Sequence, residues 1–206
     1  IPVRVPVAPL HRSRLACSKW SFFETGMDYF GAIEIKGGKA WGLLFTCLTT
    51  RAIHLETVRS MDTPTFLLAL SRFISRRGKP KIIRSDAGRS FTKGDTEVKK
   101  MFDEAEVRRQ YAEKKMEFIT NPPGSPHFGG LWERWMGLIK SCLKTSVLAA
   151  GKKVSFEVLS TALIRIENTL NRRPIAFNDE GMAICPAQLL NPLSAESTHL
   201  PLEYSP

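Results

Sequence analysis

Residues 121–144, NPPGSPHFGGLWERWMGLIKSCLK, fall into two halves of opposite character. The first half, residues 121–130, contains three prolines and three glycines. This composition predicts a loop, because both residue types interrupt helices and strands. The second half has no proline and predicts a helix, whose apolar face is formed by Leu131, Met136, Leu138, Ile139 and Leu143. A loop that leads into a helix is a common location for functional side chains.

Two charged residues share one stripe of this expected helix. If the loop ends at Gly130, Glu133 lies in the first helical turn, where the helix dipole stabilises a carboxylate without any further role. Lys140 follows seven residues later on the same stripe, with Gly137 between them. Glu133 therefore has two interpretations, a dipole-compensating acid or a catalytic one.

Two upstream aspartates favour the catalytic interpretation. Asp28 lies in ETGMDYFGAIEI and Asp86 in KIIRSDAGRSF, each after an apolar run with strand character. An acid inside such a run costs free energy unless it is paired or bound to a cation. Two strand acids and one helix acid form the oxygen donor set of two-metal phosphoryl chemistry with Mg²⁺ or Mn²⁺. The alternative for Asp86 is a turn residue without a ligand.

Five motifs occur in a specific order along the chain: GMDYFG, FTCLTTRAIHLE, LSRFISRRGKP, IRSDAGRSF and NPPGSPHFGGLWER. In this order they resemble the integrase catalytic core of LTR retrotransposons, most closely the BEL/Pao group of the retroviral-integrase-like superfamily. The resemblance extends from about Val5 to Leu190. It implies an α/β, ribonuclease-H-like fold with a mixed five-stranded sheet flanked by helices.

The resemblance also implies an activity. Asp28, Asp86 and Glu133 would be the catalytic residues and the ligands of two Mg²⁺ (or Mn²⁺) ions, with Asp28 bridging both. The expected reactions are 3′-end processing of retrotransposon DNA and strand transfer into target DNA. The enzyme would be a polynucleotidyl transferase and endonuclease that acts in the nucleus after a cytoplasmic stage. Integrases work as multimers, so a homo-oligomer is expected.

The charge balance suits a DNA partner. The net charge is +10 and the isoelectric point is near 9.7, although a basic protein with no nucleic-acid role is the alternative. The residues expected to bind DNA are Lys140, Lys144, Arg134, Arg72, Arg76, Arg77 and Lys79. The expected active-site loop, which would order around the cut strand, includes Asn121, Pro126, His127, Gly129 and Gly130. For Lys140 and the arginine cluster, a solvated surface is the alternative.

One position departs from the resemblance. Ala87 follows Asp86 where the family usually has asparagine, so SDNG has become SDAG. This keeps open a catalytically weakened or host-adopted domain that acts as a nucleic-acid-binding or interaction module. A simple ribonuclease H is a third interpretation, which the loop and helix of residues 121–144 disfavour.

Composition and the resemblance together divide the chain into three parts. Residues 1–19 are expected to be an extended linker, residues 20–175 the catalytic core and residues 176–206 a C-terminal extension. The sequence contains no run of 18 apolar residues, so it predicts no membrane span. The four cysteines do not have the spacing of a zinc finger. The expected strands cover residues 22–35, 40–49, 52–58, 81–85 and 116–120, and the other helices cover 63–77, 95–110 and 156–170.

Overall fold

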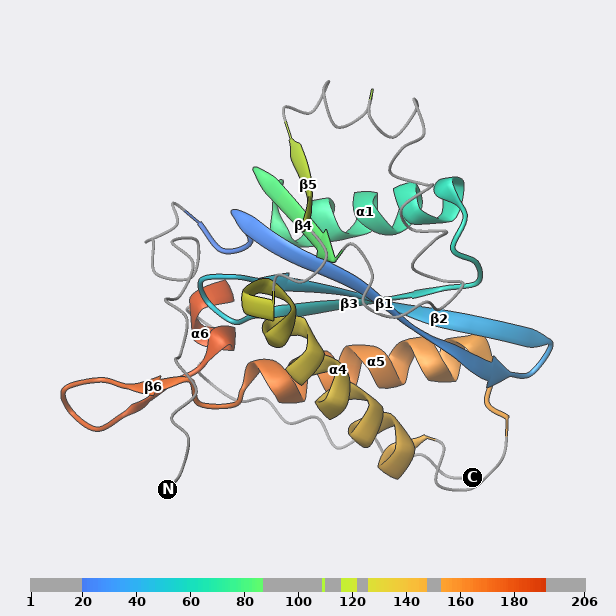
Figure 1. Cartoon of the computed structure of the whole chain (residues 1–206). Helices are drawn as coiled ribbons and strands as arrows, with labels where there is room; N and C mark the ends of the chain where they lie inside the picture. Colours follow the sequence, from blue (N-terminus) through green and yellow to red (C-terminus); the bar gives the residue numbers. More distant parts are fainter. Residues whose placement is uncertain (1–19, 87–108, 110–115, 122–125, 148–152, 192–206) are drawn as a thin grey trace, which may run out of the picture.

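A mixed five-stranded sheet forms the centre of the molecule (Figure 1). The computed structural model describes residues 20–86, 109, 116–121, 126–147 and 153–191. The sheet order is β3-β2-β1-β4-β5, and β1, β2 and β3 are antiparallel neighbours, whereas β4 and β5 run parallel to β1. The strands are β1 (Glu24–Ile35), β2 (Gly38–Cys47), β3 (Ile53–Val58), β4 (Ile82–Asp86) and β5 (Glu117–Asn121). The expected five strands are therefore confirmed, with small shifts at their ends.

Local signals set the turns and the first helix. Gly37 and Gly38 turn the β1–β2 hairpin with φ values of +82° and +144°, which glycine adopts without steric cost. Helix α1 (Thr63–Arg77) begins after Asp62, whose carboxylate accepts a hydrogen bond from the Thr65 N–H at 2.8 Å. Gly78 ends the helix with φ +85°. This crossover helix brings β4 parallel to β1, since parallel neighbours need a crossover connection of this kind.

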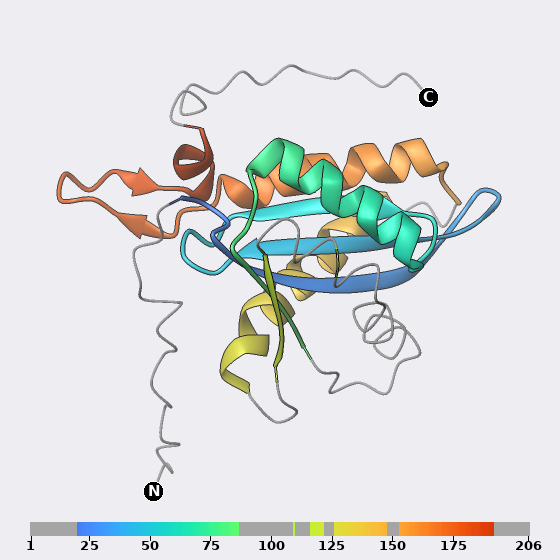
Figure 2. The ribbon, with the colours of Figure 1, turned by 90° about the horizontal axis from the view of Figure 1, so that it is seen from above.

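The sheet is covered on both faces (Figures 1 and 2). Helix α1 packs on one face, and α4 (Pro126–Ser146) and α5 (Phe156–Asn171) pack on the other. Strand β2 contributes to both cores: Leu43 and Phe45 belong to the cluster with α1, whereas Leu44 belongs to the cluster with α4 and α5. This explains why its sequence is almost continuously apolar.

The predicted extent of the loop before α4 is wrong. Asn121 is the last residue of β5, and α4 begins at Pro126, so that it includes His127, Gly129 and Gly130. Proline is tolerated in a first helical turn because its missing N–H has no partner to lose there. Glycine costs only about 1 kcal/mol relative to alanine. Burying Trp132 and Trp135 on the inner face of α4 outweighs that cost.

The observed start of α4 places Glu133 deeper in the helix than the sequence predicted. Because α4 begins at Pro126, Glu133 lies about two turns into the helix and its first turn holds no acid. Helix-dipole stabilisation decays within the first turn, so the dipole-compensating interpretation loses its basis. The inner face is formed by Trp132, Trp135, Met136, Ile139 and Leu143, two of which, the tryptophans, were absent from the predicted apolar face.

The segment after α5 forms a small appendage. Strands β6 (Ala176–Phe177) and β7 (Ala183–Ile184) make a hairpin that projects from the body in both views, and the short helix α6 (Pro186–Leu190) follows (Figures 1 and 2). The Ser21 hydroxyl donates to the Leu189 carbonyl at 3.1 Å and links α6 to the residues before β1. The linker expected over residues 1–19, and the helix expected over 95–110 apart from Arg109, lie outside the described residues. None of the helices described here is both long and apolar enough to cross a membrane.

Candidate active site at β1, β4 and α4

Asp28 lies in the middle of β1 on the side of the sheet that α4 covers. Side chains alternate along a strand, and Met27 packs in the α1 cluster whereas Phe30 packs in the cluster with α4 and α5. Asp28 therefore shares a face with Phe30 and Gly26. Its side chain is half-buried, and Oδ1 accepts a hydrogen bond from the Tyr29 backbone N–H at 2.8 Å. This bond orients the carboxylate from within its own strand.

The backbone of Asp86 runs beside that of Asp28. The parallel strands β1 and β4 pair Gly26 with Arg84 and Met27 with Ser85, so that Asp28 and Asp86 are the next residues on each strand. Neighbouring strands lie about 4.8 Å apart. On the other side of β4, Asp86 pairs with Asn121 of β5. The two aspartates, 58 positions apart in the sequence (86 − 28), are thus neighbours through strand pairing.

Helix α4 is seated on β1 next to Asp28. A Cβ atom added to Gly26 would lie 2.5 Å from Cε3 and 2.6 Å from Cζ3 of Trp132, so the indole rests directly on this glycine. Trp132 is 1% exposed, and the residue that follows it, Glu133, is exposed. The helical turn that carries Glu133 is therefore packed two residues away from Asp28 along the strand.

The donor chemistry of these three acids suits a hard divalent cation. Carboxylate oxygens are the ligands that Mg²⁺ and Mn²⁺ prefer. No group of three histidine, cysteine, aspartate or glutamate side chains gathers into a metal site among the side chains that the structure describes. The side chain of Asp86 is outside that set, and only its backbone is described. The predicted triad therefore stays a prediction.

A stripe of exposed residues continues from Glu133 along α4. Gly137, Lys140 and Lys144 follow at helical spacing and are all exposed, as is the neighbouring Arg134. A Cβ atom at Gly137 would meet no atom of the described residues within 4 Å, so these residues leave the surface between Glu133 and Lys140 uncovered. This stripe gives α4 one exposed acid and two exposed lysines.

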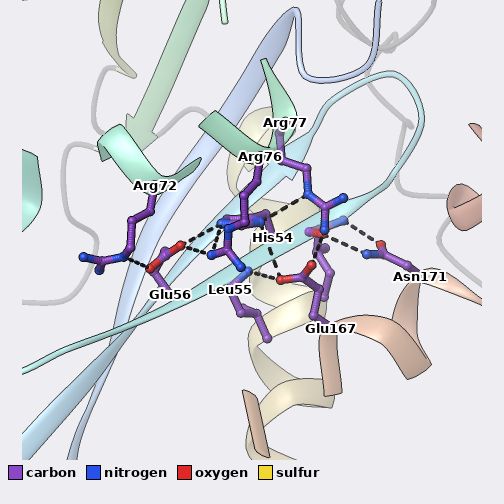
Figure 3. Close-up of polar contacts among 9 residues, drawn as sticks. His54, Leu55, Glu56, Arg72, Arg76, Arg77, Glu167 and Asn171 are labelled. Carbon is purple, nitrogen blue, oxygen red and sulfur yellow. Dashed lines mark hydrogen bonds and ion pairs between the residues drawn. The ribbon is translucent and has the colours of Figure 1, made fainter. Parts of the chain in front are cut away.

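The arginines of α1 have partners within the protein (Figure 3). Arg72 Nε lies 2.6 Å from Glu56 Oε2, Arg76 also pairs with Glu56, and Arg77 pairs with Glu167. Both glutamates are buried. Burial raises the pKa of Glu56, but the hydrogen bonds from His54 and Arg72 outweigh it, and the pKa is lowered overall. The DNA-binding role of these arginines stays a prediction, and their charge is already partly compensated.

These ion pairs belong to a network that joins α1, β3 and α5. The fully buried His54 has Nε2 at 3.0 Å from Glu56 Oε1, and its Nδ1 accepts from Arg77 Nε at 3.2 Å. Glu167 Oε2 accepts from the Leu55 N–H at 2.7 Å. Asn171 accepts from the Ile53 N–H at 2.8 Å and donates to the Ile53 carbonyl at 2.9 Å. The side chains of α5 thus provide hydrogen-bond partners for backbone N–H and C=O groups of the edge strand β3.

The sequence analysis missed this network. Its signal was the pair Glu167 and Asn171, which lie four residues apart on the buried face of α5. Polar residues at this spacing on an apolar helix face indicate hydrogen-bond partners on a neighbouring element. The network lies at β3, the opposite edge of the sheet from β5, and it serves the fold.

Comparisons with known proteins relate the chain to integrases. The family model of the integrase core domain matches residues 25–126. No curated protein matches the chain. Among solved structures, the HTLV-2 integrase catalytic core domain in complex with magnesium, in a trimeric form, is 18% identical with a TM-score of 0.60, over 85% of this chain and 100% of that one.

Two further structures have similar scores. The simian T-cell lymphotropic virus intasome in complex with PP2A regulatory subunit B56 gamma is 15% identical with a TM-score of 0.64, over 98% of this chain and 66% of that one. The BIV integrase catalytic core domain is 14% identical with a TM-score of 0.57, over 84% of this chain and 97% of that one. At these identities the likeness concerns the fold.

Proposed function

We propose that this protein joins DNA ends to target DNA. Two findings support this: the integrase core domain model matches residues 25–126, and the ribonuclease-H-like fold is shared with retroviral integrase cores. The observation that carries the proposal is the register of β1 and β4. It makes Asp28 and Asp86 the next residues on adjacent strands, and Trp132 packs α4 against Gly26 of the same strand.

The proposed catalytic residues are Asp28, Asp86 and Glu133, which would hold two Mg²⁺ or Mn²⁺ ions. Magnesium is present in the HTLV-2 integrase core. Divalent ions in such a donor set lower the pKa of a bound water or hydroxyl and stabilise charge on a leaving oxygen. The chain's own contribution is to orient the Asp28 carboxylate through the Tyr29 N–H and to offer DNA phosphates the α4 side chains Arg134, Lys140 and Lys144.

The proposed reactions are 3′-end processing followed by strand transfer. Water, and then a DNA 3′-hydroxyl, displaces a 3′-oxygen from a phosphodiester in line, without a covalent enzyme intermediate. The order of the motifs supports a BEL/Pao-type retrotransposon as the source of the DNA ends. We assign the core to residues 20–175, with homo-oligomers acting on element and target DNA in the nucleus after a cytoplasmic stage.

A strand-transfer assay tests the proposal. The full chain is incubated with Mn²⁺ or Mg²⁺ and labelled duplexes that end in the element's own terminal sequence. We expect longer joined products, which disappear in the Asp28→Asn variant. Salt-sensitive DNA binding without joining would instead favour the non-catalytic module suggested by Ala87. Cleavage confined to the RNA strand of an RNA–DNA hybrid would favour a ribonuclease H.

A further inference from the structure

We propose that Trp132 is the positioning residue for Glu133. Its indole fits into the space that the missing side chain of Gly26 leaves on β1, and this contact sets where Glu133 stands relative to Asp28. The inference rests on the proposed function, because it concerns the same carboxylates. It adds two residues, Gly26 and Trp132, that touch neither metal nor DNA in the proposed mechanism.

Gly26 is in an unfavourable place for a glycine. It lies inside β1, paired with Thr46 on one side and Arg84 on the other, and a glycine in a strand interior weakens the strand. Its backbone is not in the left-handed region, so its conformation does not call for glycine. The reason for glycine is space: an added Cβ would lie 2.5 Å from Trp132 Cε3, closer than real Cβ atoms approach their neighbours.

The contact is close to both acids along the chain. Gly26 precedes Asp28 by two residues on the same face of β1, and Trp132 directly precedes Glu133 on α4. A displacement of the indole therefore moves the two carboxylates relative to each other. A misplacement of about 1 Å costs on the order of 100-fold in rate when catalytic geometry is exacting.

Other residues also hold α4 in place, but they lie further from Glu133 along the helix. Trp135 stacks under the Arg173 guanidinium at 4.5 Å, and Ile139 is fully buried further along the helix. Ile139 is therefore a matched control, since Ile139→Ala removes packing from the same helix face two turns away from Trp132.

The test uses a clash and its relief. Gly26→Ala introduces the methyl group that meets the indole, and Trp132→Phe removes the ring to which Cε3 and Cζ3 belong. We expect Gly26→Ala to lower joining about 100-fold and to weaken Mn²⁺ binding, measured without DNA by electron paramagnetic resonance of the free ion. The double variant Gly26→Ala/Trp132→Phe should recover at least about tenfold in joining, and part of the Mn²⁺ affinity. Both are measured below the unfolding temperature of each variant, so that a change in the folded fraction does not account for the recovery.

The controls separate the two levels of the proposal. If Asp28→Asn and Glu133→Gln both keep joining and Mn²⁺ binding, the proposed function fails. If they lose both while Gly26→Ala keeps both, the function stands and the positioning role is rejected. Should Gly26→Ala not fold, Trp132→Phe and Ile139→Ala are compared below their unfolding temperatures. Equal Mn²⁺ affinities in those two variants would make Trp132 an ordinary core residue, whereas a selective loss in Trp132→Phe would support positioning.

Discussion

Glu133 is exposed and lies about two turns beyond the start of α4, too far from the helix N-terminus for the helix dipole to stabilise its carboxylate. We expect Glu133→Gln to change the unfolding temperature little in metal-free buffer, or to raise it, because the variant removes one of the three neighbouring carboxylate charges of the proposed site. Strand transfer should fall by orders of magnitude, measured with the folded variant. Near-parent joining by this variant would remove Glu133 from the proposed site.

Lys140 lies on the same exposed stripe as Glu133, and its predicted partner is a DNA phosphate. We expect Lys140→Gln to reduce the slope of log affinity against log salt by about 0.9, the value for one phosphate that the protein no longer neutralises. Lys153→Gln is the control, because the Lys153 ammonium already pairs with Glu34 at 3.0 Å on the strand hairpin. Equal slopes for the parent and Lys140→Gln would leave Lys140 as a solvated helix lysine.

At the scale of elements, α5 is held to the edge strand β3 by side chains. Glu167 accepts the Leu55 N–H and pairs with Arg77, which is 24% exposed. Replacing Glu167 with glutamine keeps the volume but leaves Arg77 without a charged partner. We expect the free energy of unfolding in urea to fall by about 2 kcal/mol, less than for a fully buried pair because Arg77 is partly solvated. Arg165→Gln, an exposed change on the same helix, should stay within about 0.5 kcal/mol.

Glu56 links the same elements and makes stability depend on pH. Its pKa in the folded protein is lowered from 4.5, so the unfolded chain binds a proton first as pH falls. The stabilisation is complete above pH 4.5 and is lost as pH falls below that value through the lowered pKa. We expect the Glu56→Gln protein to show a flatter dependence of unfolding free energy on pH below 4.5, with Glu180→Gln at the exposed hairpin as the control. Parallel curves for parent and Glu56→Gln would contradict this.

At the scale of the whole molecule, not all of the 30 lysine and arginine side chains are free to bind a polyanion, because three α1 arginines are paired with buried glutamates. The predicted DNA role of this cluster is best tested with Arg72→Gln/Lys79→Gln, which keeps Arg76 for Glu56 and Arg77 for Glu167. We expect the salt slope of DNA binding to fall by about 0.9 for each DNA phosphate that the variant leaves without a cationic side chain. An unchanged slope would make the cluster a structural, internally paired surface.

Elements with local signals can be predicted from the amino-acid sequence. Gly37-Gly38 signals a hairpin turn, Ser155 a helix start, and Asp62 or Thr63 the start of α1. The structure has this turn, with Asp62 and Ser155 as the two caps, and it has the periodic helices α1 and α5. The sequence also identifies Asp28, Asp86 and Glu133 as candidate catalytic residues. Acids in apolar runs and an ordered set of motifs can be recognised without a structure. The start of α4 was missed because local proline and glycine signals were outweighed by burial of Trp132 and Trp135.

Contacts between distant residues follow from the folded arrangement and not from local signals. The pairing of β1 with β4 brings the backbones of Asp28 and Asp86 together. The need for glycine at position 26 is explained only by the packing of Trp132 against it. Glu167 reaches a backbone N–H 112 residues away, and Asn171 reaches one 118 residues away. Such contacts depend on how whole faces of the sheet and helices pack, and packing free energy belongs to the assembled core, not to any stretch of the chain.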